Sequence, residues 1–209
     1  MIIFYDVDTQ RDFMNSDGAL PVPGAEKIKP NLKKLTEYAL KNKIQLVGSS
    51  DRHFEDDDEL KEFPPHCMDG TMGMERIEET RTPELKIEYK YAPGKFRNFK
   101  CYELDEIINP PILPRITIEK QTTDVFSNPY TSKIFEMLDV KKAITYGVAT
   151  DYCVKDAVLG MLDRGIEVYL VTDAIAGINE NSAKKFLKRM YSKGAIPVKT
   201  AEVLGGDVS

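Results

Sequence analysis

The sequence has few histidines and cysteines, and it has no apolar run long enough to cross a membrane. Among its 209 residues are two histidines and three cysteines. The cysteines, Cys67, Cys101 and Cys153, are too few and too scattered for a disulfide framework, so we expect a reducing compartment. The first residues carry no basic stretch before an apolar one, and they predict no signal peptide. Together these absences predict a cytoplasmic protein that does not enter a membrane.

An excess of positive charge is also missing. The formal net charge is −5, from 29 basic and 34 acidic residues. Because nucleic acids and anionic membrane surfaces attract basic proteins, this charge argues against either as the main partner. The hydrophobic fraction of 42% is ordinary for a globular protein, and 209 residues can bury a substantial core. We therefore expect one domain over residues 1–209.

Short apolar runs alternate with helical patterns along most of the chain. The runs predict six strands, and apolar residues three and four positions apart predict the helices between them. This alternation predicts an α/β fold, in which helices cover both faces of a mainly parallel sheet as a three-layer sandwich. The expected strands are 2–7, 44–49, 115–120, 142–147, 167–172 and 195–199, and the expected helices are 25–43, 131–138, 152–164 and 181–193.

One segment, residues 73–114, does not fit this alternation. It contains five prolines and five aromatic residues, which mark irregular structure. We interpret it as a lid-like or hairpin excursion and not as a second domain. Its aromatic-rich part, residues 85–102, is either a lid over a site or a contact between subunits.

Reactive side chains stand at or just after the ends of four expected strands. In a parallel sheet, active sites lie beyond the carboxyl ends of the strands. These side chains come from distant parts of the chain, but we expect them to meet at one edge of the sheet. They are Asp8, Asp51, His53, Lys120 and Cys153.

Cys153 stands where an expected strand passes into an amphipathic helix. In the first turn of a helix, unpaired N–H groups and the helix dipole favour a thiolate and can hold an oxyanion. A nucleophile also needs a proton acceptor, which Asp8 can provide, and a nearby cation, which Lys120 can provide. Singly, a buried hydrophobic cysteine, a turn carboxylate and a surface lysine are the commoner interpretations. Their meeting at the strand ends predicts a catalytic group.

Three motifs together resemble the signatures of the isochorismatase-like cysteine hydrolases, namely residues 8–13 (DTQRDF), Lys120 and residues 147–153 (GVATDYC). The resemblance implies the isochorismatase-like hydrolase fold with a six-stranded sheet. It also implies a catalytic triad of Cys153, Asp8 and Lys120. Finally, it implies a cis peptide bond before Ala149, with the backbone N–H groups of Ala149 and Cys153 as the oxyanion hole.

Both histidines fall in one acidic loop, residues 51–67 (DRHFEDDDELKEFPPHC). Asp51 and His53 are two positions apart, so in an extended loop their side chains point the same way. His66 follows thirteen residues after His53, behind two prolines. Imidazole and carboxylate groups in one loop are typical of a transition-metal site. The other interpretation is a solvated acidic loop with two incidental histidines.

This loop resembles that of the nicotinamidases within the same superfamily. The resemblance implies that Asp51, His53 and His66 are metal ligands. The commonest pattern has a third histidine as the fourth ligand, whereas here we expect Glu59, with the aspartates at 56–58 as alternatives. Two nitrogens and two oxygens suit zinc, and iron or manganese are the alternatives.

The resemblance also implies an activity: hydrolysis of nicotinamide to nicotinate and ammonia through a cysteine thioester, with pyrazinamide accepted too. The metal would bind the pyridine nitrogen and orient the amide, which is catalysis by positioning. Homo-oligomers are common in the family, so we expect one here. The residues expected to border the small-molecule substrate are Phe13, Phe63, Val148 and Tyr152.

Other functions stay open at this point. The same scaffold serves hydrolases of other small amides, ureides or carbamoyl compounds and isochorismate-cleaving enzymes, although members with those activities generally lack the metal loop. In another class, the chain would be a non-catalytic metal-binding or scaffold protein, because fold does not prove function. The intact set of Asp8, Lys120 and Cys153 argues against that class. A redox-sensing cysteine is a third alternative.

Overall fold

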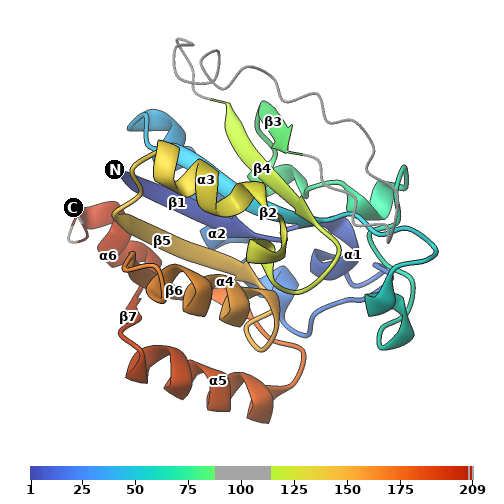
Figure 1. The fold of residues 1–209 in the computed structure, drawn as a ribbon. Coiled ribbons are helices and arrows are strands. Elements are labelled where there is room, and N and C mark those ends of the chain that lie inside the picture. The colour runs from blue at the N-terminus through green and yellow to red at the C-terminus, as the bar shows by residue number, and fades with distance from the viewer. Residues whose placement is uncertain (88–113, 207, 209) are drawn as a thin grey trace.

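The computed structural model describes residues 1–87, 114–206 and 208 (Figure 1). Its centre is a sheet of parallel strands in the order β3-β4-β2-β1-β5-β6-β7. The chain is therefore an α/β protein, as the sequence predicts. The strands are β1 (Ile2–Val7), β2 (Gln45–Asp51), β3 (Glu84–Ile87), β4 (Arg115–Lys120), β5 (Lys142–Val148), β6 (Glu167–Ala176) and β7 (Ile196–Val198).

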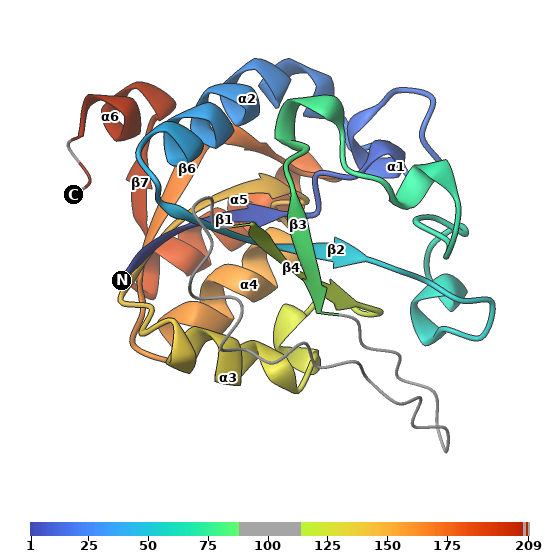
Figure 2. The same cartoon turned by 90° about the horizontal axis from the view of Figure 1, so that it is seen from above.

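Helices cover both faces of this sheet (Figure 2). Apolar side chains of α2 and α6 pack on one face, and those of α3, α4 and α5 pack on the other, which gives the predicted three-layer sandwich. The helices are α1 (Arg11–Met14), α2 (Ala25–Lys41), α3 (Tyr130–Met137), α4 (Cys153–Leu162), α5 (Glu180–Ser192) and α6 (Thr200–Gly205), and the 3₁₀ turns are η1 (Asp58–Lys61), η2 (Met72–Met74), η3 (Glu78–Thr80) and η5 (Val125–Ser127).

The sheet has a seventh strand where the sequence predicts six. The added strand, β3, lies at the edge of the sheet beside β4 and alternates exposed with half-buried residues. Charged residues at alternate positions are typical of an edge strand, because they discourage pairing with other chains. With only four residues, the alternation is too short to mark a strand in the sequence.

Most of the excursion expected over residues 73–114 lies outside the described residues. Its described part contains the end of η2, then η3 and β3. Residues 88–113, with Cys101 and all five of the aromatic residues, are not described, so the lid or hairpin stays a prediction. Within the part of the chain that is described, no helix combines the length and apolar character that a membrane span requires.

The carboxyl end of β5 passes unusually close to β1. Gly147 has a φ of 118°, and a Cβ atom added there would lie 2.1 Å from the carbonyl oxygen of Val7. Only glycine allows both this backbone conformation and this approach. The next peptide bond, between Val148 and Ala149, is cis, as the family resemblance implies. These features bring the turn before α4 beside the end of β1.

A buried ion-pair network lies behind this edge of the sheet. The Asp6 carboxylate on β1 accepts hydrogen bonds from the guanidinium of Arg115 at 2.6 Å and from that of Arg76 at 3.1 Å. Arg76 also donates to the carbonyl of Ser49 at 2.7 Å and to the hydroxyl of Thr9 at 3.0 Å. Arg76 therefore ties together the chain at the ends of β1 and β2.

Candidate active site

The carboxyl ends of four strands bring the predicted reactive residues together. Asp51 and Lys120 are the last residues of β2 and β4, Asp8 follows β1, and Cys153 begins α4 after β5. All four are almost completely buried. Because β4, β2, β1 and β5 are neighbours in the sheet, their ends place these side chains in one cluster.

The ammonium group of Lys120 is the centre of this cluster. Its Nζ atom lies 2.9 Å from a carboxylate oxygen of Asp8 and 3.4 Å from the sulfur of Cys153, and it makes a close ion pair with Asp51. A carboxylate oxygen of Asp8, one of Asp51 and the Cys153 sulfur all lie within 4.8 Å of one another. A proton can therefore pass between the thiol and Asp8 with little movement.

Burial and the charge of Lys120 shift the pKa values of the other three side chains in different directions. Burial raises the pKa of the Cys153 thiol well above its usual value, and Lys120 offsets only part of this shift. Burial also raises the pKa of Asp8, which makes it a better proton acceptor than an exposed carboxylate. For Asp51, burial is outweighed by Lys120 and the histidines, so its pKa is lowered and it stays ionised.

Around Cys153, the neighbouring backbone N–H groups donate to backbone carbonyl oxygens. The N–H groups of Tyr152 and Val154 both donate to the carbonyl of Ala149, at 3.0 and 3.1 Å. The N–H of Thr150 donates to the carbonyl of Ala176 at 2.8 Å. This bonding fixes the path of the backbone around Ala149 and Cys153, whose own N–H groups are the predicted oxyanion hole.

A second cluster lies beside the first and shares Asp51 with it. One atom from each of four side chains, Asp51, His53, Glu59 and His66, falls within 4.8 Å of the others. The Nε2 atoms of His53 and His66 each lie 3.8 Å from the same oxygen of Asp51. They lie 4.0 and 3.9 Å from an oxygen of Glu59. The structure thus brings all four expected metal ligands together.

Hydrogen bonds fix the orientation of both imidazole rings. Nδ1 of His66 lies 2.8 Å from the carbonyl oxygen of Pro64, which can only accept, so this nitrogen carries a proton. Nδ1 of His53 lies 3.2 Å from the carboxylate of Asp57, which also accepts from the N–H of Phe54 at 2.9 Å. In the neutral rings, both Nε2 atoms therefore present lone pairs to the cluster.

The donor set fits a divalent metal ion. Asp51 Oδ2 and His53 Nε2 are buried and find no hydrogen-bond partner among the described residues, an arrangement that a cation would satisfy. Four ligands about 2.1 Å from a tetrahedral zinc ion lie about 3.4 Å from one another. The observed separations of 3.8–4.0 Å exceed this by a few tenths of an ångström.

Glu59, and not one of the three preceding aspartates, faces the cluster. The 3₁₀ turn η1 directs Asp58 to the surface, where it pairs with Lys61. Asp57 lies against Nδ1 of His53, on the side of the ring away from the cluster. Burial, followed by the charge of Asp51, raises the pKa of Glu59 to about 7. In the metal-free protein this carboxyl therefore holds a proton at slightly acidic pH.

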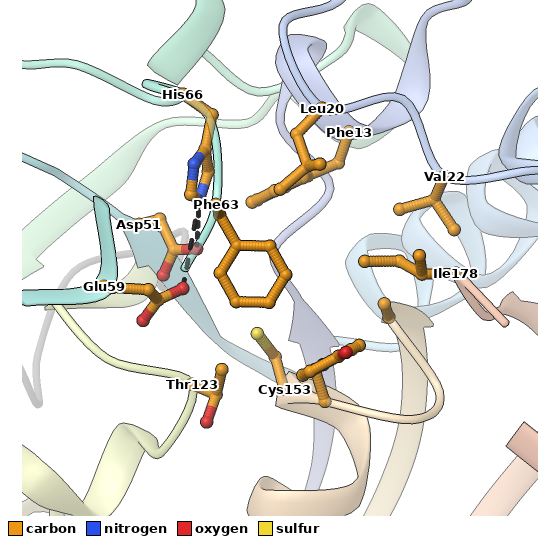
Figure 3. Close-up of a pocket in the computed structure, with 12 residues that line it drawn as sticks. Phe13, Leu20, Val22, Asp51, Glu59, Phe63, His66, Thr123, Cys153 and Ile178 are labelled. Atoms are coloured by element: carbon orange, nitrogen blue, oxygen red, sulfur yellow. Dashed lines mark ion pairs between the residues drawn. The ribbon is translucent and has the colours of Figure 1, made fainter. Parts of the chain in front are cut away.

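A cavity of about 310 Å³, including its open mouth, connects the two clusters (Figure 3). Because this volume includes the open mouth, the space that the protein encloses is smaller still, which suits a small ligand. In the figure, Asp51, Glu59 and His66 lie on one side of Cys153. The other lining residues are Phe13, Leu20, Val22, Phe63, Thr123, Ala149, Tyr152 and Ile178.

Three of the four expected substrate-bordering residues line this cavity. The Phe63 ring meets that of Tyr152 almost at right angles, with centroids 5.3 Å apart, and the Phe13 ring lies 5.2 Å from that of His66. Val148 is not among the lining residues, and its side chain is fully buried in the core. The substrate contact expected for Val148 stays a prediction.

Sequence reasoning missed several lining residues, among them Ile178. β6 extends to Ala176, four residues beyond the predicted strand end at 172, so only the observed strand end, and not the predicted one, lies next to Ile178. Its N–H donates to the carboxylate of Asp151 at 2.9 Å, which joins it to the Cys153 turn. Leu20, Val22 and Thr123 lie in loops, and no sequence pattern pointed to them.

Comparison with known proteins places this arrangement in a family. The profile of the isochorismatase domain matches residues 2–202, almost the whole chain. The chain belongs to the isochorismatase domain family. This isochorismatase-like hydrolase therefore has the family fold that its three motifs predicted, with one more strand than expected.

Several relatives of this isochorismatase-like hydrolase are nicotinamidases or pyrazinamidases. Nicotinamidase of Escherichia coli is 24% identical over 200 residues, which cover 90% of each chain. The structure of pyrazinamidase of Pyrococcus horikoshii in complex with zinc is 28% identical, covers 95% of this chain and 98% of its own, and superposes with a TM-score of 0.73. A shorter match, 30% identical over 66 residues, covers 32% of isochorismatase family protein 1B of Dictyostelium discoideum.

Proposed function

We propose that this protein is a metal-dependent amidohydrolase that converts nicotinamide and water to nicotinate and ammonia, and that also accepts pyrazinamide. The observation that carries the proposal is a small cavity with a buried thiol on one side and, on the other, three of the four converging side chains that could hold a metal ion. Aromatic residues line the same cavity, which suits a planar ring. The nicotinamidase and pyrazinamidase relatives support the choice of substrate.

The chain's own residues would hold and orient this substrate. Asp51, His53, Glu59 and His66 would bind the metal, for which zinc is the first choice and iron or manganese are alternatives. A metal held there would supply a Lewis acid for a ring nitrogen of the substrate. Phe63, which lines the cavity, would pack against the ring. The amide carbon would then face the Cys153 sulfur.

Acylation would use the cluster around Lys120. Asp8 takes the proton of the Cys153 thiol, and the ammonium of Lys120 stabilises the thiolate, 3.4 Å away. The sulfur attacks the amide carbon, and the N–H groups of Ala149 and Cys153 stabilise the oxyanion. When the tetrahedral intermediate collapses, Asp8 returns its proton to the leaving nitrogen. Ammonia departs and a thioester remains on the enzyme.

Deacylation would reuse the same groups. A water molecule takes the place of ammonia, and Asp8 accepts its proton as the oxygen attacks the thioester carbon. The same N–H groups hold the second oxyanion, and the carbon–sulfur bond breaks. The thiolate of Cys153 takes back a proton and nicotinate leaves, so each turnover consumes one water. A homo-oligomeric state and a cytoplasmic location remain predictions from the sequence and the family.

Comparison of nicotinamide with benzamide tests this proposal. The two amides differ at the ring nitrogen, so only nicotinamide has the atom that a metal could hold. We expect the zinc-loaded protein to release ammonia from nicotinamide and pyrazinamide with kcat/KM at least about 100-fold above that for benzamide. Equal rates would contradict recognition of the ring nitrogen. Turnover of linear amides, ureides or carbamoyl compounds alone would favour that other amidohydrolase activity instead.

A further inference from the structure

The side chain of Gln10 holds the main chain of Asp51. Its amide oxygen accepts a hydrogen bond from the N–H of Asp51 at 2.7 Å, and its amide nitrogen donates to the carbonyl of Asp51 at 2.7 Å. The same nitrogen donates to the carbonyl of Met74 at 2.8 Å. Gln10 is fully buried, so water does not replace these bonds. One amide thus binds both polar groups of the Asp51 backbone.

β1 stops pairing with β2 before it reaches Asp51, which leaves room beside Asp51 for the side chain of Gln10. The pairing of β1 with β2 ends at Ser49, whose carbonyl accepts from the N–H of Asp8 at 3.3 Å. Asp8 then has a φ of 46°, and the chain turns away from β2. Asp51 lies two residues farther along β2. The amide of Gln10 takes the position that a continued β1 strand would have filled.

Asp51 is the residue that the two clusters share. One of its carboxylate oxygens forms the ion pair with Lys120, and the other faces the Nε2 atoms of His53 and His66 at 3.8 Å. On the side away from Gln10, its backbone pairs with Lys120 in β4. A shift of the Asp51 backbone would therefore move a metal ligand and the partner of the catalytic lysine together.

We propose that Gln10 is a positioning residue that sets the place of Asp51 for metal binding and for the ion pair with Lys120. This inference rests on the proposed role of Asp51 as a metal ligand. Gln10 does not line the cavity, so it acts through Asp51 and not on the substrate. Partners of metal ligands typically change metal affinity or activity about 10–100-fold when they are replaced.

The same strand offers a matched control. Gln45, the first residue of β2, is also buried, and its amide nitrogen donates to the carbonyls of Leu46 at 2.7 Å and Pro114 at 3.0 Å. Gln10→Met and Gln45→Met remove similar hydrogen bonds from opposite ends of one strand. If Gln10 had only a structural role, both variants would lower stability and neither would change metal binding.

The test measures Zn²⁺ binding by the metal-free proteins in competition with a chromogenic chelator, beside urea unfolding of the same samples. We expect Gln10→Met to weaken Zn²⁺ binding at least about tenfold, and Gln45→Met to leave it unchanged. Gln10→Asn, whose amide is one methylene shorter, should also weaken binding and serves if Gln10→Met does not fold. Wild-type affinity in both Gln10 variants, or equal losses in Gln10→Met and Gln45→Met, would overturn the inference.

The same samples separate this inference from the proposed function. A wild-type protein without measurable Zn²⁺ affinity would overturn the metal centre and the role of Gln10 together. Tight Zn²⁺ binding without nicotinamide turnover would contradict the substrate alone, because the chelator competition does not depend on catalysis. Weaker binding in Gln10→Met would then still support the positioning role.

Discussion

Lys120 and Asp8 form a fully buried ion pair, with 2.9 Å between the ammonium nitrogen and a carboxylate oxygen. The same ammonium also contacts Asp51 and the sulfur of Cys153. Burial alone would lower the pKa of Lys120, but the carboxylates of Asp51 and Asp8 raise it well above its usual value. The lysine therefore stays charged, and it supplies the positive charge that a buried thiolate requires.

Replacing this lysine should damage both activity and stability. Lys120→Met leaves two buried carboxylates, Asp8 and Asp51, without their cation. Breaking a buried pair in this way typically costs about 3–5 kcal/mol, so we expect a loss near the lower figure, because Asp8 can take up a proton. Urea unfolding measures the loss, and kcat should fall at least about 1,000-fold. Lys61→Met, which removes an exposed lysine, should behave like the wild type.

Asp57 should control metal affinity without binding the metal. Its carboxylate accepts from Nδ1 of His53, which keeps the Nε2 lone pair directed at the cluster. We expect Asp57→Ala to weaken Zn²⁺ binding about 10–100-fold, as measured by chelator competition. Asp58→Ala, one residue away at the surface, is the matched control and should bind Zn²⁺ like the wild type. Equal affinities in the two variants would show that this hydrogen bond is unimportant.

Metal binding should depend on pH in the range around neutrality. Burial and the charge of Asp51 raise the pKa of Glu59 to about 7 in the metal-free protein. The pKa of Glu59 is raised in the folded state relative to the unfolded state, so the protonated carboxyl stabilises the metal-free fold. This contribution is fully present below the ordinary pKa of a glutamate and is lost as the pH rises through about 7. A ligand must be deprotonated, so Zn²⁺ affinity should fall as pH drops below about 7.

Calorimetry in buffers of different ionisation enthalpy checks this pH dependence. At pH 6, Zn²⁺ binding to the wild type should release a proton from Glu59. Glu59→Gln should release less at the same pH and should bind Zn²⁺ more weakly. Proton release that is the same in both proteins would contradict the assignment of Glu59 as the titrating ligand.

The ion-pair network of Asp6, Arg115 and Arg76 should affect the stability of the protein more than its Zn²⁺ affinity. Asp6→Asn removes the charge that Arg115 and Arg76 share at 2.6 and 3.1 Å. Arg115 then loses the carboxylate of Asp6, and Arg76 retains that of Glu84, 3.6 Å away, so we expect the free energy of unfolding to fall by about 3–5 kcal/mol. Urea unfolding measures this change. At low temperature, where the variant remains folded, its Zn²⁺ affinity should stay close to that of the wild type.

The cluster around Lys120 could be predicted because its members stand next to strands that the sequence marks clearly. Asp8, Lys120 and Cys153 each follow or end an apolar run, and parallel strands carry their carboxyl ends to one edge. The side chains of Asp51 and His53 likewise point the same way, as their spacing predicts, because the chain is still extended at the end of β2. In these places, local pattern and sheet topology together determine position.

Other parts of the site depend on loop geometry, which sequence spacing does not determine. Glu59 and Asp57 are two residues apart, and the turn η1 determines which of them faces Asp51 and the two histidines. Leu20 and Val22 line the cavity from a loop in which the N–H of Ala19 donates to the carboxylate of Asp12 at 3.0 Å. Such side-chain to backbone bonds leave no periodic signal. The edge strand β3 escaped prediction because its four residues are too few to show an alternation.

Ammonia release from nicotinamide tests the central claim most directly. Three samples are compared: the zinc-loaded wild type, the same protein after chelation, and zinc-loaded Cys153→Ala with its Zn²⁺ content measured. We predict turnover in the first sample, its loss in the second with recovery when Zn²⁺ is added back, and a loss of at least about 10,000-fold in the third. Turnover by Cys153→Ala near the wild-type rate, or no turnover by the zinc-loaded wild type, would contradict a metal-positioned thioester mechanism.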